Sequence, residues 1–287
     1  MAVEDTSPPA GIAARRAVGR WAAGGRRAVA GPLRRAVRRA GYDVVRHPAA
    51  PVVPAWPEDV DPAARPVIEA VRPYTLTSPE RIFALWQAVR YVTAADIPGA
   101  IVECGVWRGG SMMAVAMTLL AMDRADRDLY LFDTFTEMPS PGPRDVDLYG
   151  VEARCYHEQA AKEGSDPAFD YLPYERVQDL IGQTGYPPER IHFVQGLVEE
   201  TVPERAPGQI ALLRLDTDYY TSTSHEMRHL FPRVADGGVL IVDDYGHWRG
   251  SAEAVDEHLA ESGMPLLLNR IDYTARIAVV HRGAPAR

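Results

Sequence analysis

The chain is poor in cysteine and lacks any apolar run long enough to cross a membrane. Its two cysteines, Cys104 and Cys155, provide neither a disulfide framework nor the spacing of a zinc site, so we expect a reducing, cytoplasmic location. The chain also lacks the G-x-G-x-x-G pattern of dinucleotide-binding proteins, because Gly105 is followed only by Gly109 and Gly110. A pyrophosphate-containing ligand is therefore disfavoured.

Positive charge is scarce in most of the chain. The net charge of -8 divides unevenly, since residues 1–50 hold ten arginines, no lysine and three acidic residues, about +7. The remaining residues hold 31 minus 10, or 21, basic groups against 39 minus 3, or 36, acidic groups, a balance of -15. This acidic body is not expected to bind nucleic acid.

Composition divides the 287 residues into three parts. Residues 1–47 form an Arg/Ala-rich basic extension, 48–66 a proline-rich linker, and 67–287 one folded domain in which 137–175 is a lid or substrate loop. The extension lacks the apolar core of a secretory signal. Its low content of acidic residues is compatible with an organelle transit peptide, so that alternative stays open. Solvation or packing in an oligomer is favoured for it over membrane contact.

The stretch 99–113 predicts a turn that holds a cofactor. An apolar strand through Ile101 and Val102 leads to Glu103 and the glycines, and Ser111 is expected to cap the helix that follows. Asp133 ends the next predicted strand, 23 residues after Gly110, near the offset at which an acid binds ribose hydroxyls.

No basic residue accompanies these acids, which disfavours a 2′-phosphate. A ligand with ribose but no phosphate fits this pattern, and S-adenosylmethionine is the commonest one. The turn at Gln195 and Gly196 follows a further predicted strand and could border the adenine ring. The sequence therefore predicts a site for S-adenosylmethionine.

Acidic side chains also follow two later strands. Asp216 ends one apolar run, and Asp243 and Asp244 end another. Because parallel strands place their carboxyl ends at one edge of a sheet, these carboxylates should meet there, where a divalent cation would compensate their charge. Oxygen ligands favour Mg²⁺, then Ca²⁺ or Mn²⁺. Asp218 is expected to be a cap or a supporting group, and His247 a possible base or ligand.

Alternating strands and helices predict an α/β, doubly wound fold with a mostly parallel sheet. Ser78 and Pro79 begin a helix whose apolar stripe should pack in the core. Further helices are expected through 150–162 and near 173–184. Residues 264–268 and 275–280 are expected to form two strands, giving the sheet an antiparallel C-terminal hairpin.

Segments spread over residues 70–285 resemble the macrocin O-methyltransferase (TylF-like) family, which uses S-adenosylmethionine and magnesium to methylate sugars in antibiotic pathways. The resemblance is carried by the segments 73–78, 102–111, 131–135, 213–220 and 242–246. It implies a Rossmann-like class I methyltransferase fold with a seven-stranded sheet and a lid, and a homodimer or higher homo-oligomer.

The resemblance also implies roles for individual residues. Cofactor binding is implied for Glu103, Gly105, Ser111 and Asp133, and magnesium binding for Asp216, Asp243 and Asp244. The matched segments contain Thr75, Ser78 and Thr134, which we expect among the cofactor-binding residues together with Gln195 and Gly196.

Methyl transfer from S-adenosylmethionine to a hydroxyl needs the methyl donor and the acceptor to be aligned, and the hydroxyl must lose its proton. Asp216 is the candidate to take that proton, although a carboxylate bound to a metal is a poor base, and His247 or Asp218 could share the role. The acceptor implied is a sugar hydroxyl on a glycosylated natural product, while a catechol would suit the same metal geometry. A glycosyltransferase with a D-x-D site and a non-catalytic binding module are the remaining alternatives.

Deletion of residues 1–45 tests the role of the basic extension. If it packs in the oligomer, the truncated protein should lose its dimer in light scattering. An unchanged oligomeric size together with lost binding to anionic vesicles would instead indicate a surface-binding segment.

Overall fold

The computed structural model describes residues 56–163 and 169–282, and from Glu58 onward these form one compact unit around a seven-stranded sheet. The strands in sheet order are β3 (Ile191–Gln195), β2 (Leu129–Asp133), β1 (Ala100–Cys104), β4 (Ile210–Leu215), β5 (Val234–Val242), β7 (Arg276–Val279) and β6 (Asn269–Arg270). The first five are parallel, whereas β7 pairs antiparallel with β5 and with β6. The predicted fold class is confirmed.

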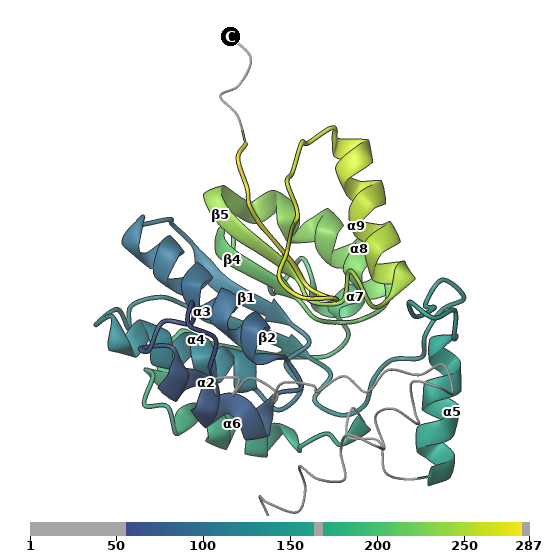
Figure 1. Ribbon diagram of the computed structural model, residues 1–287, viewed down its shortest axis with the longest axis horizontal. Coiled ribbons are helices and arrows are strands. Elements are labelled where there is room, and N and C mark those ends of the chain that lie inside the picture. The colour runs from purple at the N-terminus through teal and green to yellow at the C-terminus, as the bar shows by residue number, and fades with distance from the viewer. Residues whose placement is uncertain (1–55, 164–168, 283–287) are drawn as a thin grey trace, which may run out of the picture. The chain divides into compact units, whose positions relative to one another are not determined.

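Helices cover both faces of the sheet (Figure 1). One layer contains α2 (Arg65–Val71), η1 (Arg72–Tyr74), α3 (Pro79–Ala94), α4 (Gly110–Ala121) and α6 (Tyr174–Gly182). The other contains α7 (Val198–Thr201), α8 (Tyr220–His229) and α9 (Arg249–Ser262), and the single turns η3 (Pro188–Arg190) and η4 (Phe231–Arg233) precede strands β3 and β5. This two-sided cover explains why the central strands β1 and β4 are buried along their whole length and are apolar except at Glu103 and Arg214.

Helix α3 begins as the sequence predicts. The Ser78 hydroxyl accepts a hydrogen bond from the backbone N–H of Arg81, and Pro79 occupies the first helical position, where its missing N–H costs nothing. The predicted apolar stripe is buried, and it comprises Ile82, Leu85, Trp86, Val89 and Val92. This packing fixes the segment before α3 over the carboxyl edge of the sheet.

The start of helix α4 differs from the prediction. Ser111 does not cap it, because the helix already begins at Gly110 and Gly109 is the N-cap, with a φ of 87° that suits glycine. Ser111 therefore lies inside the first turn, where it is buried. Gly110 also lets the segment before α3 approach closely, since a Cβ there would lie 2.5 Å from the carbonyl oxygen of Tyr74.

The predicted strand 264–268 is absent from the structure. The short strand β6 follows it instead, pairing Asn269 with Ile277 and Arg270 with Arg276 of β7. Pro265 has no N–H to donate to a ladder, and Met264, Leu266 and Leu268 pack against the core without strand pairing. The apolar run at 264–268 therefore reflects packing against the core and not strand pairing.

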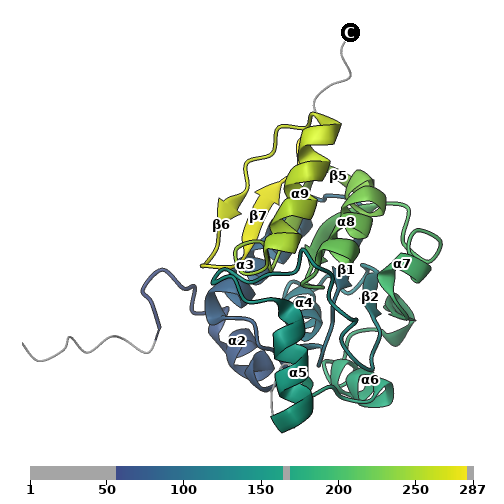
Figure 2. The ribbon, with the colours of Figure 1, turned by 90° about the vertical axis from the view of Figure 1, so that its right-hand side faces the viewer.

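The insertion after β2 contains helix α5 (Ala153–Glu163), close to the helix predicted at 150–162. This helix stands apart from α2 and α6 in Figure 1 and faces the viewer in Figure 2. Two buried carboxylates anchor this insertion. Asp145 accepts hydrogen bonds from the backbone N–H of Gly142 at 2.6 Å and of Tyr220, the first residue of α8, at 2.8 Å. Asp147 accepts from two backbone N–H groups and from the hydroxyl of Tyr156 at 2.6 Å.

The extension 1–47 and the linker as far as residue 55 lie outside the described residues. The described part of the range expected to be linker belongs to the folded unit, because Val60 and Ala64 are buried and α2 begins at Arg65. Among the described residues, no helix has the length and apolarity that a membrane-spanning segment requires.

Gly105→Ala should lower the free energy of unfolding by more than about 2 kcal/mol. The φ of Gly105 is 84°, and an added Cβ would lie 1.9 Å from the backbone oxygen of Asp216. Urea unfolding measures this change. Gly182→Ala is the matched control, because that helical glycine has open space around it and alanine should change stability by no more than about 1 kcal/mol. Equal effects of the two substitutions would contradict the close approach.

Candidate active site

A cavity opens at the carboxyl ends of β1, β2, β4 and β5, where ligands bind in doubly wound sheets. The segment Tyr74–Thr77 and Arg81 line it from the side of α3. The residues that line it from the strand ends include Gly105, Val106, Trp107, Asp133, Thr134, Asp216, Thr217, Asp218, Asp243 and Asp244. The insertion contributes Glu137, Met138, Pro139 and Tyr171 to the same wall.

Asp133 holds the glycine turn in shape. One of its carboxylate oxygens accepts hydrogen bonds from the backbone N–H groups of Val106 at 2.6 Å and Trp107 at 2.9 Å. The other accepts from the backbone N–H of Phe135 at 2.7 Å. Burial raises the pKa of Asp133, and these hydrogen bonds oppose the rise. Trp107 and Phe135 both have positive φ, so this carboxylate stabilises two strained positions beside the cavity.

Three carboxylates from two neighbouring strand ends come together. One oxygen atom from each of Asp216, Asp243 and Asp244 lies within 4.8 Å of the others. Asp243 and Asp244 are buried, while 26% of the Asp216 side chain is exposed. Oxygen atoms at this separation could surround a single cation, since each would need to lie only about 2.0 to 2.6 Å from it. Their role as metal ligands stays a prediction.

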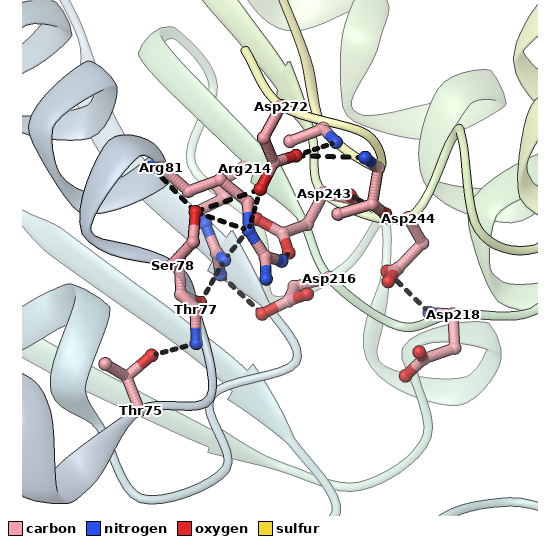
Figure 3. A network of polar contacts seen from close by, with 12 residues as sticks. Thr75, Thr77, Ser78, Arg81, Arg214, Asp216, Asp218, Asp243, Asp244 and Asp272 are labelled. Atoms are coloured by element: carbon pink, nitrogen blue, oxygen red, sulfur yellow. Dashed lines mark hydrogen bonds and ion pairs between the residues drawn. The ribbon is translucent and has the colours of Figure 1, made fainter. Parts of the chain in front are cut away.

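Arg214 lies at the centre of this cluster (Figure 3). Its Nη1 donates to Glu103 Oε1 and to Asp216 Oδ2, each at 2.6 Å, and its Nη2 donates to Asp243 Oδ1 at 2.6 Å and to Thr77 Oγ1 at 3.1 Å. Burial alone would lower the pKa of Arg214, but the surrounding carboxylates raise it well above its ordinary value. The guanidinium is therefore a permanent buried charge.

Arg81 is the second guanidinium of the cluster and comes from helix α3 (Figure 3). Its Nη1 pairs with Asp243 Oδ2, and its Nε lies 3.1 Å from Asp272 Oδ2. The Nε also donates to Ser78 Oγ at 3.4 Å, and the Ser78 hydroxyl donates to Asp272 at 2.9 Å. Burial opposes the charge of Arg81, yet Asp243 and Asp216 raise its pKa overall.

Several acids of the site hold their protons more tightly than in water. Burial raises the pKa of Glu103 to about 7 and that of Asp218 to about 6. It raises the pKa of Asp216 and of Asp244 well above the ordinary value, and the neighbouring carboxylates add to the effect. Full ionisation of all these acids would therefore need more positive charge than the two guanidinium groups supply.

Asp218 and His247 have different positions relative to the cavity. Asp218 lines it, with a φ of 64°; its backbone N–H donates to Asp244 at 3.1 Å, and its carboxylate accepts from Trp248 Nε1 at 2.8 Å. His247 is not among the lining residues, and its ring packs against Trp248 and Tyr273. The structure therefore brings Asp218, but not His247, to the carboxylate cluster.

Most residues expected to bind the cofactor line the cavity, namely Thr75, Gly105, Ser111, Asp133, Thr134 and Gly196. Three others do not. Glu103 lies beneath the surface with 1% exposure in its ion pair with Arg214, and its buried Oε2 has no hydrogen-bond partner among the described residues. Ser78 belongs to the network of Arg81, and the side chain of Gln195 donates to the backbone of Thr134 at 3.3 Å.

Sequence reasoning assigned no role to Arg81, Arg214 or Glu226. Arg214 stands two residues before Asp216 on the strand face next to Glu103, which strand register could have indicated. Glu226 lies buried on α8 and accepts a hydrogen bond from the Thr217 hydroxyl at 3.0 Å. Burial raises the pKa of Glu226 to about 8. Through Thr217, Glu226 holds the loop that carries the cavity carboxylates of Asp216 and Asp218.

Comparison with known proteins relates the chain to antibiotic-pathway enzymes. A sequence profile described as macrocin O-methyltransferase (TylF) matches residues 59–280. An enzyme of Streptomyces olivaceus, 8-demethyl-8-(2,3-dimethoxy-alpha-L-rhamnosyl)-tetracenomycin-C 4′-O-methyltransferase, is 30% identical over 215 residues, 75% of this chain and 78% of that protein. The demethyldecarbamoylnovobiocin O-methyltransferase of Streptomyces niveus is 30% identical over 66% of this chain and 68% of that protein.

Solved structures show the same fold. That of the O-methyltransferase NovP superposes with a TM-score of 0.63 and 28% sequence identity, covering 73% of this chain and 83% of that one. The calicheamicin methyltransferase CalS11 gives a TM-score of 0.54 at 19% identity, covering 83% of this chain and 99% of that one, a likeness of fold alone.

In the wild type, the free energy of unfolding should decrease as pH rises, and the Glu226→Gln substitution should make this decrease smaller. A carboxylate with a pKa of 4.5 in the unfolded chain and about 8 in the folded one stabilises the fold below pH 4.5, and that contribution is lost as pH rises through 8. Each pKa unit corresponds to about 1.4 kcal/mol. Relative to the wild type, the variant should therefore gain on the order of 4 kcal/mol between pH 5 and pH 8.5 in urea unfolding.

The exposed Glu261→Gln variant on α9 serves as the control and should follow the wild type at every pH. A wild type and a Glu226→Gln variant with parallel pH profiles would contradict the burial effect.

Proposed function

This chain belongs to the macrocin O-methyltransferase (TylF) family of S-adenosylmethionine-dependent enzymes, and from this premise we propose that it methylates a sugar hydroxyl of a glycosylated natural product with the help of a divalent cation. The observation that carries the proposal is the carboxylate cluster of Asp216, Asp243 and Asp244, which shares one cavity with the glycine turn. Cofactor site and acceptor site would thus lie side by side.

The names of the relatives support a sugar as the acceptor. The Streptomyces olivaceus enzyme is named for a substrate that carries a rhamnosyl group, and a mycinamicin III 3″-O-methyltransferase of Micromonospora griseorubida is 28% identical over 60% of this chain. The cavity wall formed by Met138, Pro139 and Tyr171 offers apolar and aromatic surface suited to a glycosylated scaffold. Family membership leaves no support for the glycosyltransferase and binding-module alternatives.

The charges in the cluster fit a hard divalent cation. The cluster contains five carboxylates, those of Glu103, Asp216, Asp218, Asp243 and Asp244. Among the described residues, the guanidinium groups paired with them are those of Arg81 and Arg214. A cation at Asp216, Asp243 and Asp244 would compensate the excess negative charge with the oxygen ligands that Mg²⁺ prefers. Mn²⁺ and Ca²⁺ take the same kind of ligand.

The residues of the chain would mainly orient the reactants. S-adenosylmethionine supplies an electrophilic methyl group, and the cation supplies Lewis acidity toward the acceptor hydroxyl. Asp133 fixes the turn that faces the cofactor, and Arg214 holds Asp216 and Asp243 in place. Such alignment contributes much of the rate of an in-line displacement.

The proton of the hydroxyl needs an acceptor in the cavity. Asp216 and Asp218 both line it, whereas His247 does not. We assign proton uptake to Asp216, with Asp218 as the neighbouring carboxylate able to share the proton. Trp248 Nε1 fixes one oxygen of Asp218, so this carboxylate is already oriented at the cavity wall.

Asp216→Asn should lower kcat for methyl transfer about 100-fold or more, because it removes both a cation ligand and the proposed base. Binding of S-adenosylhomocysteine should stay within about threefold of the wild type in calorimetry. The acceptor for the assay is a desmethyl glycosylated antibiotic, tested with magnesium chloride and again with excess chelator.

Asp236→Asn is the matched control, since Asp236 lies exposed on β5, away from the cavity lining. Turnover by Asp216→Asn at the wild-type rate would refute the assignment of Asp216, and turnover that ignores the chelator would refute the role of the cation.

A further inference from the structure

The lining of the cavity is strongly acidic. Seven side chains with carboxylates line it, namely Asp133, Glu137, Glu199, Asp216, Asp218, Asp243 and Asp244. Among the described residues of the lining, Arg81 is the only arginine or lysine. In this lining, Arg81 therefore provides the cationic side chain with which an anionic group of a ligand could pair.

The guanidinium of Arg81 retains unused donors. Its Nε contacts Ser78 and Asp272, and its Nη1 contacts Asp243. Its Nη2 makes no hydrogen bond with any described residue, although 14% of the side chain is exposed and the residue lines the cavity. A guanidinium whose Nη2 group still has donors available is suited to bind a carboxylate.

Asp243 does not depend on Arg81 alone for its charge compensation. Its Oδ1 accepts from Arg214 at 2.6 Å, so a second buried guanidinium already shares this carboxylate. A cation at the cluster would compensate Asp243 further. Arg81 can therefore interact with an additional anion without leaving Asp243 as an unpaired buried charge.

The position of Arg81 matches one end of the proposed cofactor. The segment Tyr74–Thr77 packs on the start of α4, since a Cβ at Gly110 would meet Thr75 at 2.8 Å, and Arg81 lies in the first turn of α3, which follows this segment. The ribose end of the cavity is at Asp133, at the end of β2, whereas Arg81 contacts Asp243 at the end of β5. The methionine half of the cofactor carries an α-carboxylate and an α-ammonium group, and the acidic lining suits only the second of these.

We propose that Arg81 binds the α-carboxylate of the methionine half of S-adenosylmethionine through its Nη2 edge, an inference that rests on the proposed function. The residue would act in binding and positioning, because it would hold the end of the cofactor remote from the ribose and so set the direction of the sulfonium. The same side chain contacts Asp243, so cofactor and cation sites share one guanidinium.

The test compares two ligands that differ in that carboxylate alone. S-adenosylhomocysteine carries it, and decarboxylated S-adenosylhomocysteine, with an aminopropyl thioether, lacks it. Calorimetric titration of full-length protein in magnesium chloride should show that Arg81→Gln weakens S-adenosylhomocysteine binding about 10- to 100-fold, the effect of one charge-assisted pair. Binding of the decarboxylated ligand should change less than about threefold.

Two further variants separate recognition from a structural role. Arg81→Lys keeps the charge and should recover part of the lost affinity for S-adenosylhomocysteine alone. Arg90→Gln removes an arginine from the same helix whose guanidinium stacks on Trp86 and lies 3.7 Å from Asp61, and it should bind both ligands as the wild type does.

The outcomes are distinct. Equal weakening of both ligands by Arg81→Gln, or no weakening of either, would overturn the assignment of Arg81 and leave the proposed function standing. A wild-type protein that does not bind S-adenosylhomocysteine would overturn the proposed function and this inference together.

Discussion

The buried guanidinium of Arg214 is the interaction on which the geometry of this site depends. It joins the end of β1 through Glu103, the ends of β4 and β5 through Asp216 and Asp243, and the segment before α3 through Thr77. Carboxylates this close repel one another, and removal of one partner from a buried network costs about 3 to 5 kcal/mol. Four parts of the chain, far apart in sequence, are thereby held at one point.

The fold was predictable because it follows from local patterns. Apolar runs gave the strands, Ser78 and Pro79 gave the start of α3, and the parallel order placed the carboxyl ends together. Convergence of Asp216 with Asp243 and Asp244 follows from that topology alone, since the residues at the ends of neighbouring parallel strands must share an edge. The family of the chain was also recognisable from these motifs.

What escaped prediction depends on contacts between distant segments. Arg81 reaches Asp243 across 162 positions of sequence, and no spacing within α3 indicates that pair. The cap at Ser111 failed because a left-handed Gly109 is the N-cap, two residues earlier than predicted, and the strand at 264–268 failed because this apolar run packs against the core without strand pairing. His247 shows the same limit, since its neighbour Trp248 reaches Asp218 while its own ring packs outside the cavity lining.

The carboxylate anchors of the insertion have an evolutionary consequence. Asp145 ties the insertion to the first turn of α8, and Asp147 closes its internal turn, so this part of the insertion is attached without using any group of the cluster around Arg214. Residues such as Met138 and Tyr171 can then diverge as a module while the strand ends stay unchanged. Divergence in such a module would let one catalytic frame serve pathways whose scaffolds have nothing else in common.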